Sequence, residues 1–215
     1  MKYKAINSDL FIYNRSLLAK KLKENSIAIF NSNDIMPTNS DGTMPFIQNS
    51  DLFWLSGIDQ EESVLILFPG NDDQSMREML FLKETNEHIA IWEGEKLTQT
   101  EATNTSGIKK IYWLDDLNTI LDDLITKVDF VYLNQNIHSR ATSNVQTRDD
   151  RFRLLINDRY RNKQIAEIAP LMHKLRAIKS KLEIDLIQTA CNITEAGFRR
   201  ILPIIKPGIM EYEIE

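Results

Sequence analysis

Histidines and carboxylates are the side chains that most often bind metals or move protons, and in this chain they are scattered. The sequence contains three histidines, His88, His138 and His173, and none has a second histidine at helical or strand spacing. Adjacent acidic pairs occur at Asp72-Asp73, Asp115-Asp116, Asp122-Asp123 and Asp149-Asp150. Neighbouring residues on a helix do not face one another, so these pairs favour helix caps or solvated faces. The sequence therefore predicts no metal ligands and no catalytic acid–base pair in this chain.

Motifs for nucleophilic or phosphate chemistry are also absent from the sequence. It contains no Gly-rich phosphate loop, no Gly-x-Ser-x-Gly and no Cys-x-x-Cys. Its single cysteine, Cys191, excludes an intramolecular disulfide, and its apolar surroundings predict a small core residue. We therefore expect no catalytic residue in the chain.

The composition excludes two classes of partner. The net charge is −5, with lysines and arginines spread along the chain, whereas a nucleic-acid-binding protein would show a basic stripe. No apolar run approaches the ~20 residues of a membrane span, and the first residues lack the apolar core of a signal peptide. We expect a soluble, cytoplasmic protein that binds neither nucleic acid nor membranes.

Apolar runs and turn residues predict alternating strands and helices. Unbroken apolar runs predict buried strands over 52–55 and 63–68, joined through a turn at Ser56-Gly57. The other predicted strands are 27–30, 79–82, 89–92, 111–113 and 130–133. The predicted helices are 8–24, 115–126 and 149–157, with a short helix plus loop over 98–108, and the predicted long loops are 31–45 and 134–146. This order predicts an α/β protein with a mixed central sheet and helices on both faces.

The last forty residues follow a different pattern. Ser180 and Glu183 form a capping box, and apolar residues then recur every three or four positions until Pro207-Gly208. This spacing predicts one long amphipathic helix whose apolar stripe comprises Leu182, Leu186, Ile193, Ile201 and Ile204. Residues 209–215 begin another element and end without a cap, so we expect the chain to be cut at this point. We expect a boundary between residues 1–174 and 175–215.

Two segments resemble a known family. Gln48-Asn49-Ser50-Asp51, the aromatic run after it, Ser56-Gly57 and the Val-Leu-Ile-Leu run at 64–67 resemble the N-terminal domain of aminopeptidase P. Residues 175–180 and 183–184, followed by Pro207-Gly208, resemble the segment that joins this domain to the catalytic "pita-bread" domain. Many members carry Arg before the Gln-Asn-Ser-Asp run, and here that residue is Ile47.

The resemblance implies a three-layer α/β/α fold followed by the first helix of a catalytic domain. It implies that the whole protein is an Xaa-Pro aminopeptidase, a homo-oligomer that cleaves peptides with proline second and holds two divalent metal ions, commonly Mn²⁺. The five metal ligands of the family lie beyond Glu215, so none is carried onto this chain. Prolidase, creatinase and a non-catalytic interaction protein remain alternatives on the same architecture.

One residue of this chain has an implied role near the substrate. Ile91-Trp92-Glu93-Gly94 resembles an Ile-Trp-x-Gly segment in which the Trp reaches toward the active site of a neighbouring subunit. A gating role for Trp92 competes with a place in the core of its own domain, as expected for a residue of the predicted strand 89–92.

Overall fold

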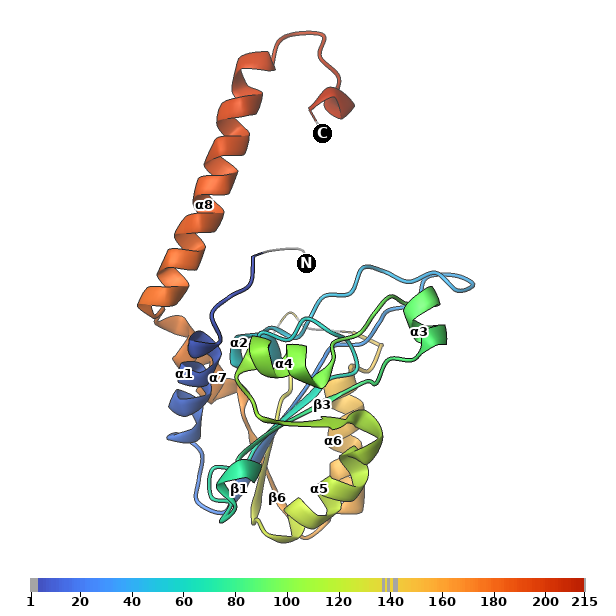
Figure 1. Ribbon diagram of the computed structural model, residues 1–215, viewed down its shortest axis with the longest axis vertical. Helices are drawn as coiled ribbons and strands as arrows, with labels where there is room; N and C mark the ends of the chain where they lie inside the picture. Colours follow the sequence, from blue (N-terminus) through green and yellow to red (C-terminus); the bar gives the residue numbers. More distant parts are fainter. Residues whose placement is uncertain (1–3, 137, 139, 141–142, 215) are drawn as a thin grey trace. The chain divides into compact units, whose positions relative to one another are not determined.

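The computed structural model describes residues 4–136, 138, 140 and 143–214, and the helices and strands below refer to these (Figure 1). The chain divides into two compact units, Met1–Leu175 and Arg176–Glu215. Parts of the predicted loop 134–146 (residues 137, 139, 141 and 142) and the last residue, Glu215, lie outside the described residues.

The first unit is built on a mixed six-stranded sheet. Its strands are β1 (Ser26–Asn31), β2 (Val64–Leu67), β3 (Glu78–Leu82), β4 (Lys110–Trp113), β5 (Phe130–Leu133) and β6 (Gln164–Glu167), in the order β4-β3-β2-β1-β5-β6. The β1–β2 and β2–β3 pairs are antiparallel, and the other three pairs are parallel. Five of these strands match the predicted ones, whereas β6 was not predicted.

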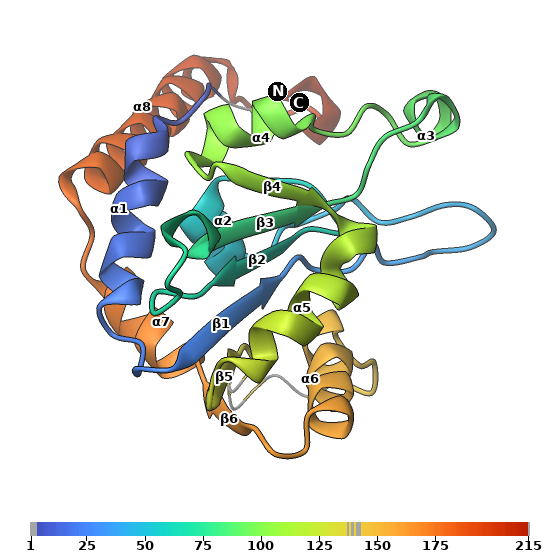
Figure 2. The same cartoon turned by 60° about the horizontal axis from the view of Figure 1, so that its bottom comes forward.

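Helices cover both faces of the sheet, which confirms the three-layer α/β/α fold (Figure 2). One face packs against α1 (Ser8–Ala19), α2 (Ser50–Ser56), α4 (Gln99–Ser106) and α7 (Ala169–Ala177). The opposite face packs against α5 (Leu117–Thr126) and α6 (Arg148–Arg159). The short helix α3 (Glu87–Trp92) buries no residue.

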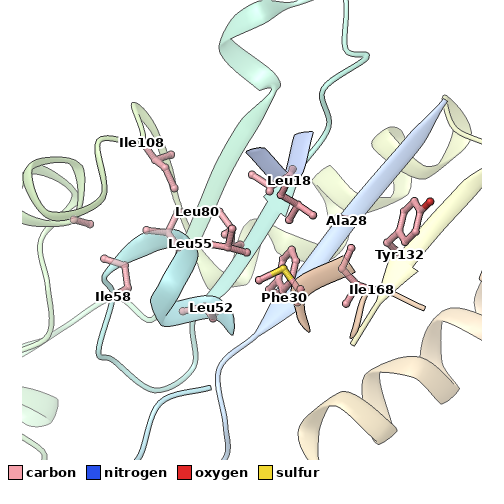
Figure 3. Close-up of a cluster of buried hydrophobic side chains, with 14 of the residues drawn as sticks. Leu18, Ala28, Phe30, Leu52, Leu55, Ile58, Leu80, Ile108, Tyr132 and Ile168 are labelled. Atoms are coloured by element: carbon pink, nitrogen blue, oxygen red, sulfur yellow. The ribbon is translucent and has the colours of Figure 1, made fainter. Parts of the chain in front are cut away.

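Alternation along the strands creates two separate cores. On β1, Ala28 and Phe30 face the layer of α1 and α2, where Leu18 and Leu52 are fully buried (Figure 3). Ile27 and Ile29 face the opposite layer, which contains Leu121 and Leu124 of α5 and Ile156 of α6. Because side chains of a strand alternate between its faces, a central strand buried on both sides is apolar throughout.

Residues 52–55, predicted to form a strand, are helical and belong to α2. The Asn49 side chain caps this helix by accepting the backbone N–H of Asp51 and Leu52, at 3.0 and 3.3 Å. Gly57 ends it with a left-handed φ of 69°, where a Cβ would meet the Phe11 ring at 2.3 Å. The caps at both ends therefore override the strand propensity of the apolar run. At position 57 the Phe11 ring leaves no room for a side chain, so only glycine fits.

Smaller differences concern helix ends. The predicted helix 8–24 ends at Ala19, and its cap is Asn7, whose side chain accepts the Asp9 N–H at 2.9 Å. The helix α7 was not predicted. Within the long loop 31–45, Pro37 and Thr43 form an antiparallel bridge.

The second unit consists mainly of α8 (Lys181–Ile201), followed by the 3₁₀ helices Leu202–Ile204 and Glu211–Glu213. The predicted capping box is confirmed: Ser180 Oγ accepts the Glu183 N–H at 3.3 Å, and Glu183 Oε2 accepts the Ser180 N–H at 2.7 Å. Cys191 is exposed and is not the core residue that the sequence suggested. No helix among residues that the structure describes is long and apolar enough to cross a membrane.

Candidate functional site

Trp92 lies at the end of α3, not in a strand. The Asn86 side chain caps this helix by accepting the Ile89 N–H at 2.8 Å, and Gly94 follows with a left-handed φ of 86°. The predicted strand 89–92 is therefore wrong: a strand needs a neighbour to satisfy its backbone, and a local cap makes a helical turn available instead. The Trp92 side chain is 76% exposed, which excludes a place in the core of this unit.

Ion pairs anchor the segment that follows α3. Glu93 pairs with Lys83 at 3.2 Å and with Lys96 at 3.5 Å. Lys96, whose side chain is almost fully buried, also pairs with Glu61. Hydrogen bonding to Lys83 is the main cause that lowers the pKa of Glu93. These contacts tie the residue after α3 to Lys83, which directly follows β3, while Ile91 and Trp92 remain exposed.

The Gln-Asn-Ser-Asp run has a structural role on both sides of α2. The side chain of Gln48 donates to the backbone carbonyls of Ile58 and Gln60, at 3.1 and 2.8 Å, and so ties the start of α2 to the segment that follows it. Gln60 in turn accepts the Leu97 N–H at 2.7 Å. Ile47, the residue before this run, is 75% exposed.

Polar side chains meet where the parallel strands β1 and β5 end. Asn31, the last residue of β1, donates to Asp149 Oδ1 at 3.0 Å, and Ser32 Oγ accepts from Arg148 Nη1 at 2.9 Å. Both partners lie in the first turn of α6, whose cap is Thr147. In open α/β sheets the carboxyl ends of the strands are the usual place for ligands.

The neighbouring strand β5 contributes to the same end of the sheet, which is called the polar edge below. Asn134 follows β5 and donates to Asp51 Oδ2 in the first turn of α2, at 3.2 Å. The edge therefore joins two strand ends to the first turns of two helices, α2 and α6.

The surroundings of Asp149 at the polar edge shift the pKa of its carboxyl group. Burial raises its pKa to about 6, and the charges of Asp150 and Asp51 act in the same direction. The hydrogen bond from Asn31 and the charge of Arg148 oppose this rise. A carboxyl group in this environment titrates near neutral pH instead of near pH 4.

A pocket of about 300 Å³ opens beside this edge. It is lined by Asp34, Ile35, Glu62, Arg148 and Arg151, which come from the segment after β1, the turn before β2 and the first turn of α6. The pocket thus contains two guanidinium groups, two carboxylates and one aliphatic side chain.

No metal-ligand set comes together in the part of the chain that the structure describes. His88, His138 and His173 are each exposed, and the described residues contain no group of three His, Cys, Asp or Glu side chains that could hold an ion. Residues 4–136, 138, 140 and 143–214 therefore contain no candidate metal site. Asp149, in one of the acidic pairs assigned to caps, instead lies at the polar edge described above.

Sequence reasoning missed this polar edge although a signal for it was present. Polar residues directly follow two predicted strands: Asn31 and Ser32 follow the strand 27–30, and Asn134 follows the strand 130–133. Two parallel strands end at the same side of a sheet, so their terminal polar residues are brought together. That inference requires the strand order, which the sequence pattern alone did not provide.

Comparison with known proteins places these observations in a family. The family model described as "Aminopeptidase P, N-terminal domain" matches residues 11–132, more than half of the chain. The Xaa-Pro aminopeptidase of Escherichia coli (strain K12) is 26% identical over 211 residues, covering 98% of this chain and 48% of that protein. The Xaa-Pro aminopeptidase of Haemophilus influenzae is 25% identical over 201 residues, covering 94% and 44%. The chain thus spans about half the length of the curated relatives it matches.

Solved structures agree with the sequence comparison. A structure from Bacillus anthracis assigned to aminopeptidase P has a TM-score of 0.87 and 25% identity, covering 97% of this chain and 49% of that one. The low-pH form of Escherichia coli aminopeptidase P has a TM-score of 0.77 and 25% identity, covering 98% and 48%. These likenesses extend over both units of the chain.

Proposed function

The chain belongs to the aminopeptidase P N-terminal domain family, and we propose that it is the N-terminal, non-catalytic part of an Xaa-Pro aminopeptidase. The whole enzyme would be a hydrolase that releases the N-terminal residue of peptides with proline second. The observation that carries this proposal is coverage: the Xaa-Pro aminopeptidases of Escherichia coli and Haemophilus influenzae align with 98% and 94% of this chain, which spans 48% and 44% of their length.

We propose that the two parts of the chain belong to different domains of that enzyme. Residues 1–174 would form the N-terminal domain, and 175–215 would be the linker and the first helix of the catalytic domain. Support comes from the contact pattern, which separates Met1–Leu175 from Arg176–Glu215. It also comes from α8, which has no buried residue and carries exposed Leu182, Leu186 and Ile193.

The catalytic metal ions belong to the other half of the proposed enzyme. Two divalent ions, manganese in this proposal, would be held by residues outside this chain. The described residues contain no fitting ligand group, so these 215 residues alone are proposed to be inactive.

The N-terminal domain would contribute subunit contacts in a homo-oligomer and help to form the mouth of the active site. Trp92 is the residue proposed to gate substrate access, because it is 76% exposed and its short helix is anchored by ion pairs at its base. An exposed aromatic ring at an anchored position suits contact with an apolar, proline-containing peptide. We place the enzyme in the cytoplasm, where short peptides would be its partners.

Peptide cleavage by a longer protein that contains this chain, as the proposal requires, is the test. With Mn²⁺ present, it is expected to release the first residue of a pentapeptide with proline second, and to leave the same peptide with alanine second intact. Cleavage of Xaa-Pro dipeptides alone would identify a prolidase. Absence of both metal binding and cleavage would identify an interaction protein.

A further inference from the structure

The pocket beside the polar edge contains a guanidinium, that of Arg148, which forms no salt bridge among the described residues. Arg148 donates from Nη1 to Ser32 Oγ, and among the described residues it has no carboxylate within 4.0 Å. The other charges of the pocket are paired: Arg151 Nη2 lies 2.6 Å from Asp34 Oδ1, and Glu62 Oε2 lies 2.7 Å from Lys83 Nζ. Of the two guanidinium groups in this pocket, that of Arg148 is therefore the one whose donors are not used in a salt bridge among the described residues.

The guanidinium of Arg148 is partly buried. Burial is the main cause that lowers the pKa of Arg148, while the charges of Glu62, Asp34 and Asp149 oppose that effect. A guanidinium presents several donors in a planar fork that matches a carboxylate. With one donor held by Ser32, the group is oriented while its remaining donors can bind a ligand.

The carboxylates of the pocket limit which anion fits. Glu62 and Asp34 both line it, so a doubly charged anion such as phosphate would meet two negative charges near Arg148. A ligand that carries a positive group beside its carboxylate would instead be attracted by all three side chains. The pocket therefore favours a zwitterion over a simple anion.

Glu62 has an uncommon backbone conformation. Its φ is 51°, in the left-handed region that a non-glycine residue rarely adopts. This conformation lies in the turn before β2, from which the Glu62 side chain lines the pocket.

The size of the pocket sets the size of the ligand. A volume of about 300 Å³ is at the low end for small-molecule sites, and Ile35 supplies an aliphatic wall. We propose that this pocket binds a free aliphatic α-amino acid, with its carboxylate on Arg148, its ammonium group between Glu62 and Asp34, and its side chain against Ile35. This site is independent of the proposed peptidase activity and uses none of its residues.

L-valine is a suitable probe, and backbone amide chemical shifts of the complete 215-residue chain are the readout. Valine is expected to bind saturably, with a dissociation constant on the order of 1 mM, and to shift the amides of residues 32–35, 62 and 148–151. Valinamide lacks the carboxylate, and N-acetyl-valine lacks the ammonium group. Each is expected to bind at least about tenfold more weakly, because one charge-assisted hydrogen-bond partner is lost.

Variants assign the two halves of the ligand to their partners. Arg148→Gln should weaken valine binding about tenfold and abolish the preference for valine over valinamide. Glu62→Gln should abolish the preference for valine over N-acetyl-valine. Arg159→Gln is the matched control, because Arg159 lies at the other end of α6 and pairs with Asp122; it should bind valine as the parent does.

Three outcomes would overturn the proposal: no saturation by valine, inorganic phosphate binding as tightly as valine, or equal binding by Arg148→Gln and Arg159→Gln. A thermal melt verifies that each variant is folded. If Arg148→Gln does not fold, the comparison of valine with valinamide on the parent chain decides the matter.

Discussion

Arg15 and Glu78, 63 positions apart in the sequence, form an ion pair of 2.9 Å in which the arginine side chain is only 1% exposed. Arg15 also donates from Nη1 to the carbonyls of Leu55 and Ser106, at 2.8 and 2.9 Å. One guanidinium on α1 therefore satisfies carbonyls in the last turns of α2 and α4 and reaches the first residue of β3. Burial lowers the pKa of Arg15, and Glu78 opposes this shift.

We predict that Arg15→Ala destabilises the chain by about 3–5 kcal/mol, because it leaves buried carbonyls without donors and Glu78 without its partner. Urea denaturation at pH 7 measures the change. Arg199→Ala is the control, since Arg199 and Glu195 form an exposed pair on α8 whose loss should cost at most about 0.5 kcal/mol. Equal midpoints for the two variants would contradict the role given to Arg15.

Asp149 gives a pH-dependent prediction. Its folded-state pKa of about 6 lies above the ordinary value of 3.8, so the folded state binds the proton more tightly than the unfolded state. The stability that Asp149 contributes by binding a proton in the folded state is therefore fully present below about pH 4. It is lost as the pH rises through about 6. We expect Asp149→Asn to be more stable than the parent by about 1–2 kcal/mol at pH 7, after allowing for the lost interaction with the helix dipole.

The test for Asp149 is the difference between the two unfolding curves as a function of pH. The stability advantage of Asp149→Asn should shrink between pH 7 and pH 4 and disappear at the lower end. Other carboxylates cancel in this difference, including Glu93 and Glu101, whose pKa values are lowered. A difference that is constant with pH would show that Asp149 does not titrate in this window.

The layers of the fold were predictable, but the assignment of two apolar segments was not. Val64 to Leu67 and Leu52 to Leu55 are both continuous apolar runs, and only the first is a strand. The difference lies in the flanks: Asn49 caps a helix, and Gly57 ends it in a left-handed conformation beside Phe11. Periodicity cannot distinguish a short buried helix from a short buried strand, so flanking residues decide.

The polar edge could not be predicted for a different reason. Asn31 and Asp149 are separated by 118 positions, and their hydrogen bond depends on β1 lying beside β5 in the sheet. Nothing in the local sequence of either residue specifies that neighbour. The weakly apolar strand β6, with Gln164 and Glu167 at its ends, was missed because its pattern is short and half polar.

Trp92 provides a prediction that separates function from stability. We expect Trp92→Ala to change the unfolding free energy of this chain by no more than about 0.5 kcal/mol, since the ring is 76% exposed. Trp54→Ala is the control. Trp54 packs against the core between the sheet and helices α1 and α2, and its loss should lower the free energy of unfolding by about 3 kcal/mol. Thermal melts of both variants give the comparison.

In the extended enzyme, the same Trp92→Ala change should affect substrate handling. Loss of an aromatic contact is expected to remove about 1–2 kcal/mol of binding, seen mainly as a higher KM when the contact is equal in ground and transition states. Unchanged kcat and KM would contradict the proposed gating role.

The apolar stripe of α8 predicts self-association of the isolated chain. Leu182, Leu186 and Ile193 are 44%, 40% and 70% exposed, and large exposed apolar patches favour association. Leu186→Asp should therefore reduce the molar mass measured by light scattering, whereas Gln188→Asp, a change at a polar position of α8, should not. If the parent and Leu186→Asp are equally monomeric, the stripe does not drive association.

The central claim is that this chain belongs to an Xaa-Pro aminopeptidase whose chemistry lies outside these 215 residues. The most direct test compares the 215-residue chain with an extended protein that contains it, using calorimetric titration with Mn²⁺ and release of the first residue from a peptide with proline second. The account predicts no stoichiometric Mn²⁺ binding and no turnover by the 215-residue chain, and both by the extended protein. A tight metal site with turnover in the 215-residue chain, or an extended protein that binds metal but cleaves no such peptide, would contradict it.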